Sequence, residues 1–341
     1  MLLRAFAPVS RAWAVAAFMA LASGQAAASG AAPAPPSEVR AWLLRIHDAA
    51  SRRNFQGTFI VSGGGVMASA RIAHFFEGAN QYERIESLDG RQRKVFRHND
   101  IVQTVWPGSH VAMIEQRGML SSFPALLQAG DDGIAEWYDV HADGIERVAG
   151  HEANVLVVKA RDTVRYGYRL WADRASGLLL RADVVAANGD ILETSAFSDV
   201  AIGVRSQPES VVQAMKRLDG YRVVRPVLTP TRLDAEGWAM QAPAPGFRQV
   251  SCVRRQMAAP GDPETPAQPP VIQSIYSDGL TYVSVFIEPF RADRHARPLL
   301  VVVGATSTLA QRQGDFWITV VGDTPAATLK TFFGALQRRK P

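Results

Sequence analysis

The sequence is poor in cysteine and in long apolar runs. Cys252 is the single cysteine among 341 residues, so no intrachain disulfide can form, and the fold must depend on apolar cores. With 47% hydrophobic residues, the chain can build such cores. After the N-terminal region, no segment approaches the about 20 consecutive apolar residues that a membrane-spanning helix needs. We therefore expect a soluble chain.

The motifs that usually mark an active site or a metal site are also missing. The seven histidines never stand at i, i+4 spacing with a glutamate, and a lone cysteine offers no pair of thiolates. A G-x-S-x-G elbow, a P-loop and a dinucleotide fingerprint are absent. Acid pairs such as Glu83 and Glu86 are interpreted as solvated charges. We expect no metal, no cofactor and no catalytic residue, and predict that the protein is not an enzyme.

Cys252 lies between arginines in the segment RQVSCVRRQM. Nearby cations can lower the pKa of a thiol and make it reactive. Unpaired cysteines are more often small buried residues of a strand, and this second interpretation is favoured.

The N-terminal residues have the pattern of a secretory signal peptide. Arg4 and Arg11 precede an apolar run from Ala12 to Ala22, which is followed by small residues up to Ala28. We predict a signal peptide over residues 1–28, cleaved near Ala28, and export to the bacterial periplasm, because exported eukaryotic proteins usually carry more cystines. Cleavage lowers the formal net charge from +5 to +3, so nucleic acid is not an expected partner.

The mature chain divides into two predicted domains. After a flexible leader over 29–36, Ser37 is a candidate N-cap of a helix with Val39, Leu43 and Ile46 on one face. The rest of 37–203 is mostly strand-like, with turn signals such as Gly63 to Gly65. Residues 204–218 are polar and are predicted to be an interdomain linker. Residues 219–341 hold further strand candidates, a proline-rich loop from Ala258 to Pro270 and a C-terminal helix.

The two strands in NFQGTFIVSGGGVMASARIAHFF carry apolar residues on both faces, whereas a strand with one face in water alternates. Two explanations compete: a helix and a loop cover the sheet and make an ordinary core, or a curved sheet keeps a partly open apolar cavity. Composition favours the ordinary core. The candidate cavity or lid residues are Phe59, Val61, Ile72, Phe76, Val105, Trp106, Met113, Phe123, Leu126 and Trp137.

The segment GRQRKVFRH is strongly basic. As a strand it would place Arg91, Arg93 and Arg97 on one face, with Lys94 and His98 on the other. Positive charges discourage pairing at an exposed sheet edge, which is the favoured explanation. The alternative is a site for an anionic ligand or an acidic partner segment.

Several segments together resemble the RseB/MucB family of periplasmic regulators of the envelope-stress sigma factor. They are RYGYRLWADRASGLLLRADVVAANGDILETSAFSDV, FQGTFIV, ERIESLDGRQRKVFR and YSDGLTYVSVFIEP, in the expected order. The resemblance implies an α+β fold: an N-terminal LolA-like antiparallel half-barrel with helices, and a smaller C-terminal α+β domain. It shifts the explanation of the two-faced strands towards the cavity.

The resemblance also implies a function. The protein would bind the periplasmic region of a single-span anti-sigma factor through 219–341, shield it from regulated proteolysis, and release it when lipid A-like or other acylated ligands enter the half-barrel. A lipoprotein or lipid carrier is the alternative, although a carrier needs only the first domain. A hydrolase is disfavoured by the missing motifs. The sequence leaves a homodimer open.

Overall fold

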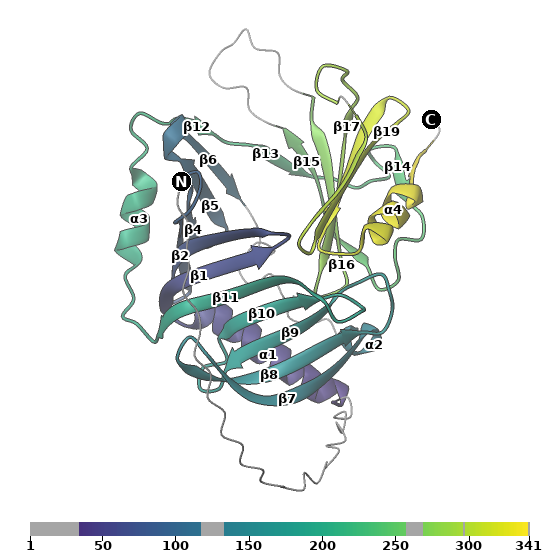
Figure 1. Ribbon diagram of the computed structural model, residues 1–341. Helices are drawn as coiled ribbons and strands as arrows, with labels where there is room; N and C mark the ends of the chain where they lie inside the picture. The colour runs from purple at the N-terminus through teal and green to yellow at the C-terminus, as the bar shows by residue number, and fades with distance from the viewer. Residues whose placement is uncertain (1–33, 117–132, 257–268, 296, 340–341) are drawn as a thin grey trace, which may run out of the picture. The chain divides into compact units, whose positions relative to one another are not determined.

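The computed structural model describes residues 34–116, 133–256, 269–295 and 297–339. Within them lie two large sheets, a short two-stranded sheet and four α-helices (Figure 1). The helices are α1 (Pro36–Arg52), α2 (Ile134–Trp137), α3 (Pro208–Lys216) and α4 (Ala326–Ala335), with a 3-10 turn, η1 (Pro107–Ser109). The predicted α+β class is confirmed.

The first sheet has twelve strands in the order β12-β6-β5-β4-β3-β2-β1-β11-β10-β9-β8-β7. It is an open sheet, because the terminal strands β12 and β7 are not paired with each other, and all its pairs are antiparallel except β12 with β6. The strands are β1 (Phe55–Gly63), β2 (Val66–Glu77), β3 (Asn80–Ser87), β4 (Lys94–His98), β5 (Ile101–Trp106), β6 (Val111–Gln116), β7 (Tyr138–Val148), β8 (His151–Ala160), β9 (Gly167–Asp173), β10 (Leu179–Val185), β11 (Ile191–Ile202) and β12 (Arg222–Val224).

The second sheet has seven antiparallel strands in the order β13-β15-β16-β17-β20-β19-β18. They are β13 (Val227–Pro230), β15 (Arg248–Gln256), β16 (Val271–Ser277), β17 (Tyr282–Pro289), β18 (Leu299–Val303), β19 (Thr306–Gln313) and β20 (Phe316–Gly322). Helix α4 covers one face and buries Leu329 and Phe332 against it. The short pair β14 (Trp238–Met240) and β21 (Leu336–Arg338) lies beside α4.

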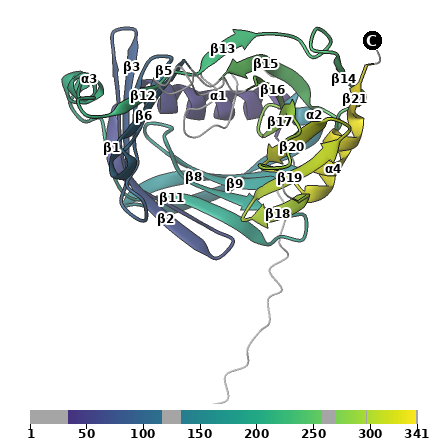
Figure 2. The same ribbon diagram turned by 90° about the horizontal axis from the view of Figure 1, so that it is seen from above.

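Helix α1 packs on the first sheet through the face that its sequence spacing predicts. Val39, Leu43 and Ile46 are buried in one cluster with residues of β7, β8, β9 and β10 (Figures 1 and 2). The predicted cap is wrong, because Pro35 occupies the N-cap position and Ser37 lies inside the helix. Proline suits a helix start because its fixed φ is compatible with helix entry and the first N–H groups have no intrahelical partner.

Helix α3 covers the second face of strands β2 to β6, which explains their apolar residues on both sides (Figure 1). On β2, Ala73 and Phe75 pack in a cluster with Val211 of α3, which is fully buried. The alternate residue Ile72 packs in a different cluster with Phe55 and other residues near the C-terminal end of α1. Both faces of β2 therefore carry apolar side chains that pack against other parts of the protein.

The interpretation of 204–218 as a polar linker is wrong for the described structure. Val204, Met215 and Leu218 pack against the cluster under α3, and the chain then adds β12 to the first sheet beside β6. The first sheet's last strand therefore ends at Val224, and the second sheet's first strand begins at Val227. Helix α3 lies in this segment, and its apolar residues pack on the first sheet.

Glycines of the first sheet occupy two kinds of position, a turn and the inside of a strand. Gly64 and Gly65 form the predicted turn between β1 and β2, with φ of 58° and 77°, which residues with a side chain rarely adopt. Gly144, in contrast, lies inside β7, where the register with β8 shifts between Ala142 and Ile145. Such a shift is a β-bulge, a position at which glycine is common.

Candidate functional site

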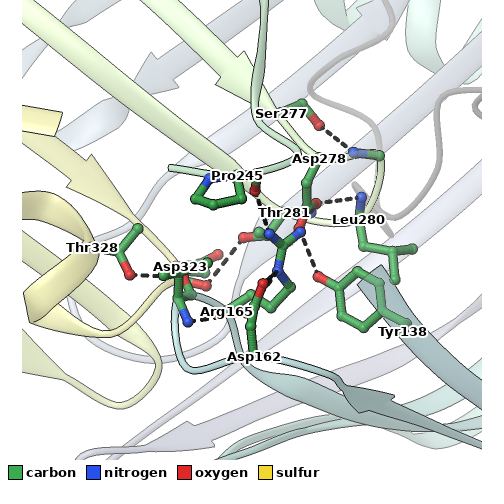
Figure 3. A network of polar contacts seen from close by, with 12 residues as sticks. Tyr138, Asp162, Arg165, Pro245, Ser277, Asp278, Leu280, Thr281, Asp323 and Thr328 are labelled. Atoms are coloured by element: carbon green, nitrogen blue, oxygen red, sulfur yellow. Dashed lines mark hydrogen bonds and ion pairs between the residues drawn. The ribbon is translucent and has the colours of Figure 1, made fainter. Parts of the chain in front are cut away.

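A buried arginine joins the two sheets (Figure 3). Arg165, in the connection between β8 and β9, is fully buried in its side chain, and its Nη1 donates to Oδ2 of Asp278 at 2.6 Å. Its Nε donates to the carboxylate of Asp162 at 3.1 Å, and Nη2 donates to the carbonyl oxygen of Pro245. Three acceptors thus use the guanidinium fork, and two of them belong to the second half of the chain.

Aromatic rings surround the same guanidinium group. Its carbon lies 4.9 Å from the ring centroid of Trp137, 5.6 Å from that of Tyr138 and 5.3 Å from that of Phe247, within the range of cation–π attraction. The hydroxyl of Tyr138 donates to Oδ2 of Asp278 at 2.8 Å. Burial, and then the charge of Asp278, raise the pKa of Tyr138 well above its ordinary value, so this hydroxyl keeps its proton and remains a donor.

Asp278 is held by its own turn as well as by Arg165. Its Oδ1 accepts the backbone N–H groups of Leu280 and Thr281, each at 2.9 Å (Figure 3). The carboxylate is fully buried, and both of its oxygens are used. An ionised carboxylate is costly inside a protein unless it is paired and hydrogen-bonded, and here both conditions are met.

Two further contacts join the two halves of the chain, one beside Arg165 and one away from it. Thr328 of α4 donates its hydroxyl to the carbonyl oxygen of Val164 at 2.7 Å. Away from that point, Arg255 of β15 pairs with the buried carboxylate of Glu115 in β6. The described contacts therefore include two ionic links between the sheets, of which only that of Arg165 is fully buried. We call the set around Arg165 the junction.

The candidate cavity residues do not gather at one place. Ile72 and Phe59 pack in the cluster around Phe55, whereas Val105 packs under α3, on the opposite face of the sheet. Val105 and Ile72 therefore cannot line one cavity. Trp137 packs beside α1 and next to Arg165. The remaining described candidates are half-buried: Val61, Phe76, Trp106 and Met113. Phe123 and Leu126 lie outside the described residues.

The three candidate arginines for an anionic ligand also lie in different surroundings. Arg91 and Arg93 are exposed and precede β4, so they do not belong to the strand in which the sequence placed them. Arg97 does lie in β4, but it is 3% exposed, and its Nε lies 3.1 Å from Oε2 of Glu83. The prediction that Arg97 binds an anionic ligand or partner is therefore corrected: Arg97 is a buried partner of Glu83. Their ion pair compensates the cost of burying both charges. A ligand role for Arg91 and Arg93 stays a prediction.

Two larger pockets within the described residues lie on the first sheet. One, of about 820 Å³, lies along β8 to β11 and combines apolar side chains such as Val157, Val185 and Ile191 with both cationic and acidic ones, such as Lys159 and Glu146. The other, of about 450 Å³, includes Ile72 and the backbone around Gly57. Volumes of this order accommodate small ligands.

Cys252 is half-buried, and burial raises the pKa of its thiol, which opposes thiolate formation. Among the described residues, no group of three or more His, Cys, Asp or Glu side chains is arranged to hold a metal ion. No helix within those residues is long and apolar enough to cross a bilayer.

Sequence reasoning missed the junction. The turn at Ser277-Asp278-Gly279 has a recognisable signal, because Asp favours turns by accepting backbone N–H groups. Nothing local indicates that Asp278 meets Arg165, which lies 113 residues earlier. Only the pairing of distant segments reveals this contact.

Protein-family comparison covers both halves of the chain. The model of the MucB/RseB N-terminal domain matches residues 38–215, and that of the MucB/RseB C-terminal domain matches residues 232–337. The gap between the two matches contains the end of the first sheet and the start of the second.

Two curated relatives extend over most of the chain. The sigma factor AlgU regulatory protein MucB of Pseudomonas aeruginosa is 31% identical over 297 residues, which are 84% of this chain and 87% of the relative. The sigma-E factor regulatory protein RseB of Escherichia coli K12 is 26% identical over 326 residues, or 94% and 98% of the two chains. Both relatives are named as regulators.

Solved structures agree with this assignment. The complex structure of Pseudomonas aeruginosa MucA/MucB matches with a TM-score of 0.65 at 27% identity and covers 89% of this chain and 100% of the matched chain. A crystal structure of MucB in complex with MucA(peri) matches with a TM-score of 0.63 at 26% identity, with 90% and 100% covered. The two domain matches, together with these full-length similarities, show that the chain belongs to the MucB/RseB family of sigma-factor regulatory proteins.

Proposed function

We propose that this protein is a periplasmic regulator that binds the periplasmic region of a membrane-anchored anti-sigma factor and shields it from regulated proteolysis. One observation carries the proposal: similarity to MucB in its complex with MucA extends over 89% of this chain and 100% of the matched chain. The similarity spans both sheets, whereas a lipid carrier would need only the first domain. The signal peptide predicted over residues 1–28 supports export.

We further propose that acylated, anionic envelope-stress ligands weaken this binding. The pocket of about 820 Å³ on β8 to β11 supports the acylated part of the idea, because its lining includes apolar side chains such as Val157, Val185 and Ile191. Each buried CH₂ group of an acyl chain contributes about 0.8 kcal/mol, so affinity should rise with chain length. Arg91 and Arg93 do not line this pocket and are separate exposed candidates, which would favour anionic headgroups by binding phosphate in bidentate fashion.

The experiment measures displacement of a labelled periplasmic region of the source bacterium's anti-sigma factor by lipids of increasing chain length at fixed salt. We expect binding without lipid, and displacement that strengthens with chain length. Changing Arg91 and Arg93 to Glu should weaken displacement by anionic lipids more than by neutral ones. Arg97 is left unchanged, because charge reversal there would break a buried ion pair.

Two failures of this experiment have different meanings. No binding of the anti-sigma region by the folded wild-type protein would refute the regulator proposal. Binding with equal displacement by short and long chains, or with no displacement, would refute only the lipid step.

A further inference from the structure

The second sheet ends in an exposed apolar strand. The five residues of β18 are Leu299, Leu300, Val301, Val302 and Val303, and each of these residues is 43% to 52% exposed. Successive residues of a strand point to opposite faces, so apolar side chains are uncovered on both sides. Exposed single apolar residues are ordinary, but five in sequence on one strand form a contiguous surface.

The position of β18 explains this exposure. It is the last strand of the sheet, with β19 on its inner side (Figure 2). Leu300 is in register with Leu309 of β19, which is buried in the core of the second sheet. Helix α4 packs against β19 and β20, so the core surface continues onto β18 beyond the helix. An added strand would extend this surface by one more row.

β18 also lacks the features that usually prevent edge pairing. Natural edge strands are protected by charges, by proline or by bulges. β18 contains no charged residue and no proline, and its register with β19 is unbroken from Leu299 to Val303. The opposite edge of the same sheet, β13, ends in Pro230. The two edges therefore differ, and β18 is the one open to another strand.

The apolar surface continues onto the first sheet. A Cβ atom added to Gly64 would lie 2.5 Å from the backbone nitrogen of Gly304 and 3.2 Å from Cγ1 of Val303, so the β1–β2 turn directly contacts the end of β18. Val66 and Met67, which follow this turn, are 59% and 71% exposed. A segment bound along β18 can therefore reach apolar side chains of both sheets.

We propose that β18 is a docking edge, to which an extended, mainly apolar segment of the anti-sigma factor's periplasmic region adds as an eighth strand. This inference rests on the proposed function and specifies where the partner is held. Main-chain hydrogen bonds to the edge would provide affinity, and alternate side chains would provide selectivity. A five-residue strand paired with its own copy would bury far less than the roughly 1,600 Å² of a standard interface, so a longer partner segment is the better occupant.

The test compares the same substitution at the two edges of the sheet. Val301→Lys places a charge on β18, on the face where Val301 is in register with Thr308, and Val227→Lys does so on β13, where Val227 is 57% exposed. Calorimetry with the purified anti-sigma periplasmic region should show at least tenfold weaker binding for Val301→Lys and less than a twofold change for Val227→Lys. Hydrogen exchange of the wild-type protein should slow at residues 299–303 when the partner binds.

The possible results separate the proposed function from the docking edge. If the wild-type protein does not bind the anti-sigma region, the proposed function fails, and the docking edge fails with it. If the wild-type protein binds, and Val301→Lys binds equally well or residues 299–303 gain no protection, the docking edge alone is overturned. A wild-type dimer that Val301→Lys converts to a monomer, with partner affinity unchanged, would assign the edge to a second copy. If Val301→Lys fails to fold, the exchange measurement on the wild-type protein decides.

Discussion

At the scale of single residues, His74 is a neutral group held inside the first sheet. Its Nδ1 lies 2.8 Å from the carbonyl oxygen of Arg53, so this nitrogen carries the proton, and its ring stacks on Phe55 with centroids 5.1 Å apart. Burial lowers the pKa of His74, and the charge of Arg97 also lowers it, against the hydrogen bond to Arg53. Nε2 has no hydrogen-bond partner within the described structure.

The lowered pKa of His74 predicts an acid-sensitive stability. Below about pH 6.5 the unfolded chain takes up a proton on His74, whereas the folded protein resists protonation there. The folded protein is therefore fully stable with respect to this histidine above that pH, and its free energy of unfolding decreases as the pH falls. The melting temperature of the wild-type protein should therefore fall more between pH 7.5 and 5.5 than that of His74→Gln. The neighbouring Glu83, whose pKa burial raises, acts in the opposite direction, but it is common to both proteins.

The control for this titration is the exposed His110, at which φ is 51°. His110→Asn should keep the wild-type acid sensitivity, since asparagine tolerates this backbone conformation. Equal pH dependence of the wild-type protein and His74→Gln would contradict the assignment.

At the scale of elements, α3 makes the segment between the predicted domains part of the first sheet's core. Val211 is fully buried against the first sheet, and Gln213, two residues later, is exposed. Burying an unpaired charge is among the costliest single changes, so Val211→Lys should lower the free energy of unfolding by at least about 2 kcal/mol. Gln213→Lys should change it by less than about 0.5 kcal/mol. Urea unfolding measures both variants.

The same pair of variants distinguishes a packed helix from a linker. If 204–218 were a flexible connection, the two lysines would have equal and small effects, and limited proteolysis would cut this segment equally in both. We expect faster cleavage near α3 in Val211→Lys alone.

At the scale of the whole molecule, Arg165 links the two sheets. Removing one partner of a buried ion pair typically costs about 3–5 kcal/mol, whereas an exposed pair contributes about 0–1 kcal/mol. Arg165→Met should therefore destabilise the protein strongly. Arg161→Met, which breaks an exposed pair with Asp139, should have little effect. Both are compared by urea unfolding.

A double-mutant cycle gives the coupling at the junction directly. Arg165→Met combined with Asp278→Leu should cost clearly less than the sum of the two single changes, since neither charge is then left unpaired in the interior. Strict additivity would mean that the contact between Arg165 and Asp278 does not help hold the sheets together.

The sequence by itself determined what depends on local pattern. The apolar face of α1 follows from its helical spacing, the β1–β2 turn follows from Gly64 and Gly65, and the strands follow from runs of β-branched and aromatic residues. The family resemblance followed from short segments in a fixed order. These features need no knowledge of distant contacts.

Only the tertiary structure decided which residues meet across the chain. Arg97 and Arg91 have the same charge and lie six positions apart, yet Arg97 is buried beside Glu83 while Arg91 is exposed. Val211 lies in a polar segment and still completes a core, because the facing strands leave an apolar surface that must be covered. Burial depends on what packs against a residue, and those partners are distant in the sequence, so local pattern could not specify α3's position, the junction or the exposed edge of β18.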